Sequence, residues 1–91
     1  MTRLEQFEAA LRNVKLLQAK YEWSVALKSI EEQLEYLISL ESGISRDSSK
    51  LGNINIGVLA AREVEDMDRN IANQLHSVSA EVKRMAGATR A

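Results

Sequence analysis

The chain contains no cysteine and no proline, and its aromatic residues are one Phe, one Trp and two Tyr among 91 residues. Without cysteine, disulfides, thiolate catalysis and most structural zinc sites are excluded. So few aromatic rings provide no surface on which nucleic-acid bases could stack. Twelve Lys and Arg against thirteen Asp and Glu give a net charge of −1, without the excess of positive charge that nucleic-acid binding requires. We therefore do not expect a nucleic-acid partner.

Long apolar segments are also missing. Glu5 and Glu8 interrupt the amino-terminal segment, and no run resembles the core of a signal peptide or could cross a membrane. These features predict a cytoplasmic protein with no membrane partner. A chain of 91 residues has room for one domain and little space for a deep pocket. We therefore expect no enzyme, no cofactor and no metal.

The apolar residues that are present recur with the period of helices. Thr2 and Glu5 have the spacing of a capping box, and a first helix is predicted from there to Lys20. Its apolar face comprises Leu4, Phe7, Leu11, Val14 and Leu17. The segment Tyr21–Trp23 breaks this period and predicts a short connection between antiparallel helices.

The second predicted helix, Ser24–Glu41, is apolar on two sides. One stripe comprises Leu27, Ile30, Leu34, Leu37 and Ile38, and the other comprises Val25, Tyr36 and Leu40. The second stripe either packs in the bundle or is offered to another protein. Gly43 supplies a left-handed residue of the kind that commonly ends a helix.

A third helix is predicted from Asp47 or Ser48, with an apolar face of Leu51, Ile54, Val58, Ala61 and Val64. We expect it to be broken or bent near Gly57, because glycine destabilises a helix. Asp68 is expected to cap a last helix with Ile71, Leu75, Val78, Val82 and Met85 on its apolar face. The prediction is an all-α antiparallel bundle of about four helices, a single domain over residues 1–86 followed by a disordered tail, residues 87–91.

Two candidate sites are weak. Asp66, Asp68 and Asn70 alternate like the first ligands of a calcium loop, but Ile71 and Ser77 occupy the positions where that loop needs Gly and Glu. His76 is the single histidine, so it cannot build a His-based zinc site or a catalytic dyad without partners. We interpret it as a partly exposed helix residue.

The acidic residues are more informative because they are clustered. Glu31, Glu32, Glu35 and Glu41 lie in a stretch, residues 29–45, that contains no Lys or Arg. A second group comprises Glu63, Glu65, Asp66 and Asp68, with Arg62 and Arg69 nearby. Carboxylates one helical turn apart repel one another. Such surfaces are either solvated faces or contacts for a basic partner.

Two aromatic residues leave a similar choice open. Tyr36 lies on the second stripe of its helix beside Glu32, and it either packs against a neighbouring helix or anchors an interface. Trp23, in the turn between two helices, either covers the core or projects as an anchor. We select as candidate protein-binding residues Glu31, Glu32, Glu35, Tyr36, Glu63, Glu65 and Asp66.

Short motifs along most of the chain, from Leu4 to Val82, resemble the small immunity proteins of bacterial type VI secretion. They are Gln33-Leu34-Glu35-Tyr36-Leu37, then Asp47, Ser49, Leu51, Gly57, Ala60, Glu63 and Asp68. Within this group, the chain resembles the immunity protein that neutralises an NAD(P)-degrading effector. The sequence departs from it at Tyr21-Glu22-Trp23, where Pro-Gly is expected, and at Arg69, where proline is favoured.

The resemblance implies an all-helical inhibitor that binds a cognate toxin domain, an NAD(P)-degrading glycohydrolase, in the cytosol and occludes its active site. Two alternatives stay open. The chain could be an immunity protein for a toxin of different chemistry, or a helical adaptor that self-associates as a homodimer, as the regular spacing from Ile71 to Met85 would allow.

Overall fold

The computed structural model describes residues 1–89, with side chains up to residue 87, and contains four α-helices and two short helical turns. The α-helices are α1 (Arg3–Lys20), α2 (Val25–Glu41), α3 (Ile56–Leu59) and α4 (Arg69–Thr89). The turns are η1, a 3-10 turn (Leu51–Asn53), and η2, a π-helical turn (Ala60–Val64). The described residues include no strand, and the prediction of a small all-α bundle is confirmed.

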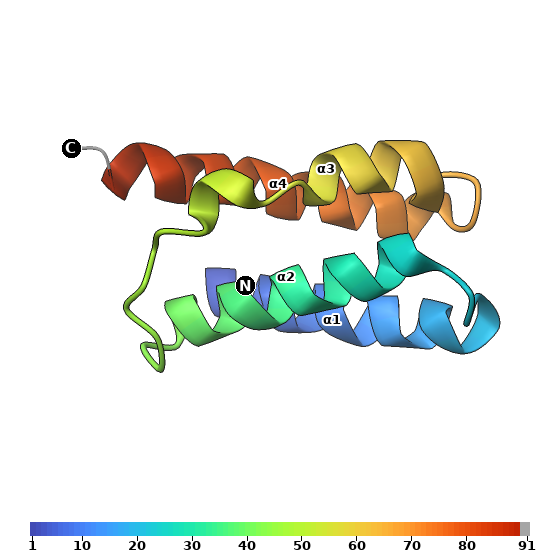
Figure 1. Ribbon diagram of the computed structural model, residues 1–91, viewed down its shortest axis with the longest axis horizontal. Helices are drawn as coiled ribbons and strands as arrows, with labels where there is room; N and C mark the ends of the chain where they lie inside the picture. The colour runs from blue at the N-terminus through green and yellow to red at the C-terminus, as the bar shows by residue number, and fades with distance from the viewer. Residues whose placement is uncertain (90–91) are drawn as a thin grey trace.

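The helices form a closed bundle about 39 Å long and 24 by 22 Å across. Figure 1 shows α1 and α2 as one antiparallel pair and α3 and α4 as the other. Contacts between α1 and α4 and between α2 and α3 join the two pairs, so every helix has two neighbours. No helix in the described part of the chain has the length and apolar character needed to span a bilayer.

Local side-chain bonds fix the starts of three helices where the sequence predicts them. The Thr2 hydroxyl accepts from the Glu5 amide at 3.1 Å and a Glu5 carboxylate oxygen accepts from the Thr2 amide at 2.9 Å, which completes the predicted capping box. The Ser24 hydroxyl accepts from the Leu27 amide, and Asp68 Oδ1 accepts from the Ile71 amide. Gly43, after α2, has φ of +85°, as expected of a helix C-terminus.

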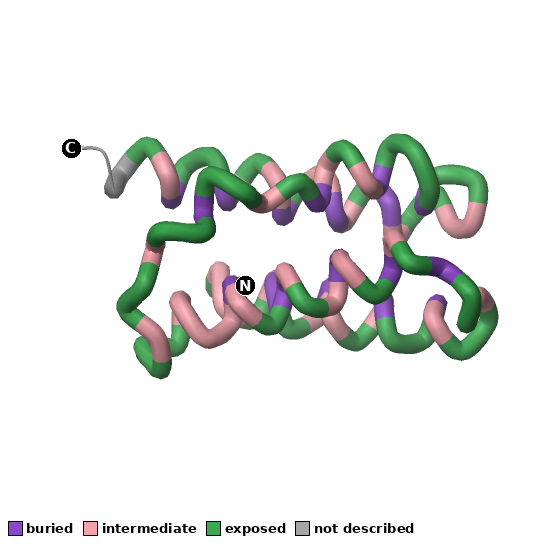
Figure 2. The backbone as a smooth tube through the Cα atoms, in the orientation of Figure 1, coloured by how far each residue is buried: buried purple, intermediate pink, exposed green. Residues whose placement is uncertain are grey.

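The core lies along the bundle axis, where Figure 2 shows the buried backbone positions facing inward from every helix. Its largest fully buried side chains are Phe7, Val14, Leu27, Ile30, Leu34, Leu37, Ile56, Val64, Leu75 and Val78. On α2 the second stripe divides, because Tyr36 and Leu40 pack partly against this core whereas Val25 is 82% exposed.

The predicted course of the third helix needs correction. The chain does not become α-helical near Asp47, since η1 is followed by extended backbone at Ile54 and α3 begins only at Ile56. The expected break is therefore present just before Gly57. Val58 and Ala61 are exposed instead of core residues, because the inward face of this segment is Ile56, Ala60 and Val64.

The carboxyl-terminal boundary also differs from the prediction. Helix α4 continues through Thr89, beyond residue 87, where we expected the tail to begin. Gly87 costs the helix stability, but it lies near the helix end and does not stop it. The remaining residues of the predicted tail, 90 and 91, lie outside the described residues.

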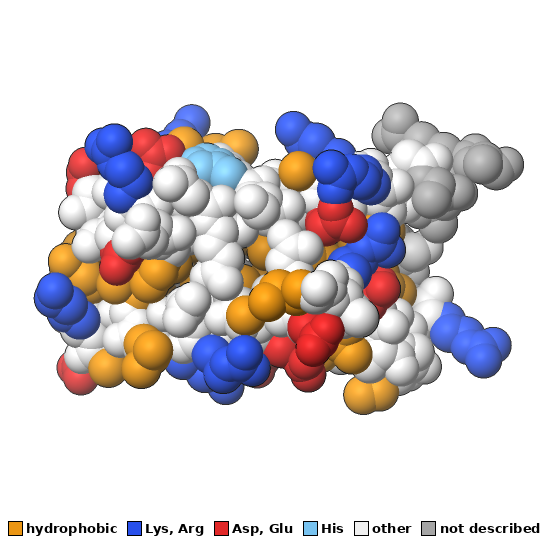
Figure 3. Space-filling model, turned by 180° about the vertical axis from the view of Figure 1, so that it is seen from behind, with side chains coloured by type: hydrophobic (Ala, Val, Ile, Leu, Met, Phe, Trp, Pro, Cys, Tyr) orange, Lys and Arg blue, Asp and Glu red, His pale blue; other side chains and the backbone are white. Residues whose placement is uncertain are grey.

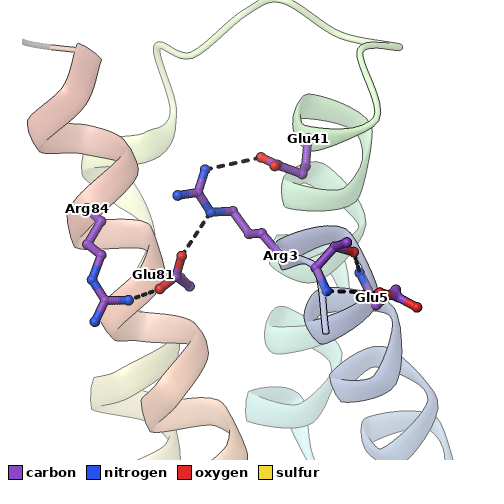
Figure 4. Close-up of polar contacts among 6 residues, drawn as sticks. Arg3, Glu5, Glu41, Glu81 and Arg84 are labelled. Atoms are coloured by element: carbon purple, nitrogen blue, oxygen red, sulfur yellow. Dashed lines mark hydrogen bonds and ion pairs between the residues drawn. The ribbon is translucent and has the colours of Figure 1, made fainter.

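A polar network joins three helices at one end of the bundle (Figure 4). The Arg3 guanidinium contacts Glu81 of α4 at 3.0 Å and Glu41 of α2 at 3.5 Å. Arg84 pairs with the other carboxylate oxygen of Glu81. Because Glu81 and Glu41 are largely shielded, with 16% and 27% of their side chains exposed, this network ties the start of α1 to its two neighbours.

Candidate protein-binding surface

The turn between α1 and α2 is closed by backbone hydrogen bonds and exposes an indole ring. The Tyr21 amide donates to the Leu17 carbonyl at 2.9 Å, the Ser24 amide donates to the Tyr21 carbonyl at 3.1 Å, and Ser24 is buried. Trp23, held between these bonds, is nevertheless 72% exposed. The sequence left its role open, and the structure shows that it projects from the bundle instead of covering the core.

A groove of about 490 Å³ adjoins this turn and continues along the first two turns of α2. Its lining residues are Gln18, Glu22, Trp23, Ser24, Val25, Lys28, Ser29, Glu31 and Glu32. Two of the predicted binding residues, Glu31 and Glu32, therefore share a groove with exposed apolar side chains. The sequence predicted the two acids but did not select Val25, whose apolar side chain at the first position of a helix indicated only a place on the second stripe.

The carboxylates of Glu31, Glu32 and Glu35 lack basic partners within the described residues. Glu31 accepts a hydrogen bond from the neutral Gln18 amide at 3.3 Å. None of the three forms an ion pair with the described part of the chain, where the acidic partners are Glu41, Glu65 and Glu81. The negative charge on this face of α2 is thus open to solvent or to a partner.

Tyr36 lies one turn further along α2 and is half-buried. Its hydroxyl donates to the Asp47 carbonyl at 2.6 Å, which fastens the connector after α2 to the helix. Tyr36 also lines a second groove, of about 320 Å³, together with Glu32, Gln33, Lys50 and Ile54. Tyr36 therefore packs partly against the protein, as one of the two sequence alternatives required, and its role in an interface stays a prediction.

The second acidic group lies on a different part of the bundle. Glu63, Glu65 and Asp66 are exposed residues of η2 and the turn that follows it. Glu65 contacts His76 of α4, with 3.0 Å between Oε2 and Nε2. The structure therefore places Glu65 beside a titratable partner that the sequence did not assign to it, because the two residues are far apart in the chain. His76 is partly exposed, as predicted.

His76 also lines a third groove, of about 580 Å³, between α3 and α4. Arg62 and Lys83 carry its positive charges, and Val58 is half-exposed within it. Figure 3 shows that, on the face seen from behind, Lys and Arg side chains lie close to Asp and Glu side chains. Glu31, Glu32 and Glu35 on α2, which form no ion pair with the described residues, thus differ from the mixed charges on the face drawn in Figure 3.

The geometry assigns Asp68 to a structural role. Its carboxylate caps α4 through the Ile71 amide at 3.0 Å, as predicted. Within residues 1–89, no three or more His, Asp or Glu side chains are grouped so that they could hold a metal ion.

Both the sequence and the structure are similar to those of a known protein family. The family sequence model described as Tsi6 matches residues 2–84. The structure of Tsi6 from Pseudomonas aeruginosa is similar to this one, with a TM-score of 0.81 and 28% sequence identity, and the match covers 90% of this chain and 85% of that chain. No curated protein matches the sequence significantly.

Proposed function

Because this chain belongs to the Tsi6 family of type VI secretion immunity proteins, we propose that it inhibits its cognate toxin by covering the toxin's active site. An immunity protein binds a toxin protein and inhibits without chemistry of its own. The proposal adds that the toxin is an NAD(P)-degrading glycohydrolase, that capture takes place in the cytosol, and that the acidic face of α2 makes the contact.

The observation that carries the proposal is that the carboxylates of Glu31, Glu32 and Glu35, on one face of α2, form no ion pair with the described residues. A cleft that binds an anionic dinucleotide needs basic groups for its phosphates, and carboxylates can pair with the same groups. Acidic side chains of an inhibitor therefore compete directly for the positions of the phosphates. Complementary charge also accelerates association, which favours an inhibitor that must reach a toxin before it turns over substrate.

Occlusion suits the architecture of the bundle. Helices that pack on two neighbours each provide a rigid surface, which limits the entropy lost when the complex forms. Tyr36, anchored by its bond to the Asp47 carbonyl, adds a fixed aromatic contact beside the acids. Glu63, Glu65 and Asp66 are proposed as a second contact region.

Co-expression with the toxin encoded beside this chain tests the proposal. We expect restored growth, preserved NAD(P), and inhibition of the purified toxin domain that higher NAD concentrations relieve. The double variant Glu31→Lys with Glu35→Lys should fold normally and protect less well, whereas Glu8→Lys, on the exposed side of α1, should protect like the wild-type chain.

Distinct outcomes separate the alternatives. Loss of NAD(P) and of viability despite good expression would contradict the immunity role. Protection against a toxin that leaves NAD(P) intact would retain that role and change the chemistry of the target. A stable dimer in sedimentation that ignores the toxin would support the self-associating adaptor.

A further inference from the structure

The most exposed apolar residues beside the acidic groove are Trp23 and Val25, at 72% and 82% exposure. A chain of this size has few apolar groups to spare from its core, and tryptophan is usually well buried. Trp23 and Val25 lie on either side of the buried Ser24, so the same turn presents both. Their exposure gains nothing for the stability of the bundle.

The indole of Trp23 already has a packing partner within the protein. The Tyr21 ring meets it edge to face, with ring centroids 6.1 Å apart and planes at 85°. The backbone is fixed on both sides of Trp23 by the bonds of Tyr21 and Ser24. An anchor that is already ordered loses little conformational freedom on binding, and tryptophan is among the residues most often dominant at protein interfaces.

The charges around the indole indicate which kind of surface can cover it. Glu22, Glu31 and Glu32 line the same groove, and Lys28 is the basic residue among its described lining residues. Lys20 lies nearby, with its ammonium 5.8 Å from the centre of the Tyr21 ring. A second copy of this chain placed symmetrically on the groove would bring these carboxylates together, since a twofold interface pairs a patch with itself. A membrane with anionic lipids would repel them as well. A protein surface rich in Lys and Arg would instead be complementary in charge to these carboxylates.

We propose that Trp23 is the central anchor of the interface with the toxin. Its indole enters an apolar recess of the toxin, Val25 packs at the edge of that recess, and basic residues on its rim pair with Glu31 and Glu32. The inference rests on the proposed function and adds to it the apolar centre of the contact, at the α1–α2 end of the bundle.

Binding of the purified catalytic domain of the toxin encoded beside this chain, measured by surface plasmon resonance, tests the inference. Trp23→Ala should weaken the affinity roughly 30- to 1000-fold, mostly through faster dissociation, and Val25→Ala should weaken it less. Glu32→Lys should instead slow association, most strongly at low salt. Because these side chains are exposed, the thermal unfolding midpoints of all three variants should match that of the wild-type chain.

Two matched controls show whether the effects are local. Ile44, at 83% exposure, follows the other end of α2, about 25 Å away for a helix of 17 residues. Ile44→Ala should bind like the wild-type chain, since it removes an equally exposed apolar group far from the turn. Glu8→Lys, a charge reversal on α1, should leave the association rate nearly unchanged.

The possible failures are distinguishable. If the wild-type chain does not bind the toxin domain, the proposed function is overturned and the inference falls with it. If the wild-type chain binds and Trp23→Ala binds equally well, the function stands and the inference is wrong. A wild-type dimer that Trp23→Ala dissociates without loss of toxin binding would assign the indole to a second copy and also overturn it.

Discussion

At the scale of single residues, Gly57 sets how closely α3 can approach α4. A Cβ atom at this position would lie 2.7 Å from the Ser79 hydroxyl oxygen and 3.1 Å from the Ser79 Cβ. The sequence indicated Gly57 as a point of helix weakness, yet the residue lies inside α3 and the break precedes it. Because Gly57 has no side chain, Ser79 can lie this close, and an added Cβ would require Ser79 to shift.

A double-mutant cycle tests this role of Gly57. Gly57→Ala should lower the free energy of unfolding by about 1 kcal/mol, because overpacking costs more than the helix propensity that alanine gains. In a Ser79→Ala background the same change should cost less, with a coupling of at least about 0.5 kcal/mol. Urea denaturation provides the four stabilities. Stabilisation by Gly57→Ala in both backgrounds would mean that the two helices can separate freely.

Glu5 provides a residue-scale prediction for pH. The hydrogen bond from the Thr2 amide, then that from the Thr2 side chain, hold the pKa of the Glu5 carboxyl below its ordinary value of 4.5. A carboxyl with a lowered pKa in the folded state contributes stability above its unfolded pKa and loses it as the pH falls through the folded value. We therefore expect this contribution to be complete above pH 4.5 and to fade below it.

Carboxyl-carbon NMR titration of Glu5 checks the direction, and Glu5→Gln should remove the corresponding part of the acid-side slope of stability. An ordinary Glu5 pKa in the folded protein would contradict the capping box.

At the scale of elements, the start of α3 depends on a side chain of α2. Gln33 accepts from the Asn55 amide at 2.9 Å and donates to the Asn55 side-chain oxygen at 2.7 Å. It also donates to the Ser29 hydroxyl at 3.1 Å. Asn55 is the N-cap of α3 but makes no cap bond of its own to that helix. The first turn of α3 is thus positioned by hydrogen bonds to a side chain of α2.

Gln33→Ala should therefore weaken α3 more than the rest of the bundle. We expect a loss of about 1 kcal/mol in unfolding free energy, as for a pair of partly exposed hydrogen bonds, and faster amide exchange at Leu59, whose amide donates to the Asn55 carbonyl. Gln6→Ala on α1 is the matched control, because it removes the same side chain at a position where that side chain makes no hydrogen bond to another helix within the described residues. Equal exchange at Leu59 in both variants would sink the idea.

This dependence explains why sequence patterns predict some elements better than others. The starts of α1, α2 and α4 are set by local caps, Thr2, Ser24 and Asp68, and such caps are visible in the sequence. The start of α3 is set by Gln33 across the bundle, and the π turn that follows keeps both Ala60 and Val64 buried. Neither the Gln33 bonds across the bundle nor the π turn can be recognised from the local sequence pattern.

The candidate surface shows the same contrast between features set by local sequence and features set by tertiary packing. Glu31, Glu32 and Glu35 could be placed on one face of α2 because helical spacing is regular, and they form no ion pair with the described residues. The exposure of Trp23 depends on how the turn sits on the bundle, and the contact between Glu65 and His76 depends on how η2 meets α4. The sequence therefore predicted the position of the acidic residues and left the exposure of Trp23 undecided.

At the scale of the whole molecule, the net charge of −1 is an average over unlike surfaces. The acids Glu31, Glu32 and Glu35 make no ion pair with the described residues, although Lys28 and Lys50 line the grooves beside Glu32. Glu65 of the second group contacts His76, and Arg62 and Lys83 line the groove beside it. The field outside the bundle should therefore be most negative along α2, and a basic toxin should approach that side first.

Two neutralising variants of equal charge test this asymmetry. One replaces Glu31, Glu32 and Glu35 by Gln, and the other replaces Glu63 and Glu65 by Gln and Asp66 by Asn. Stopped-flow association with the toxin domain at low salt should slow about tenfold for the first variant and severalfold less for the second. The first should also show the weaker dependence of rate on ionic strength, because its steering charges are gone. Equal slowing of both would mean that the toxin senses only net charge, and a larger effect of the second would move the contact to η2 and the start of α4.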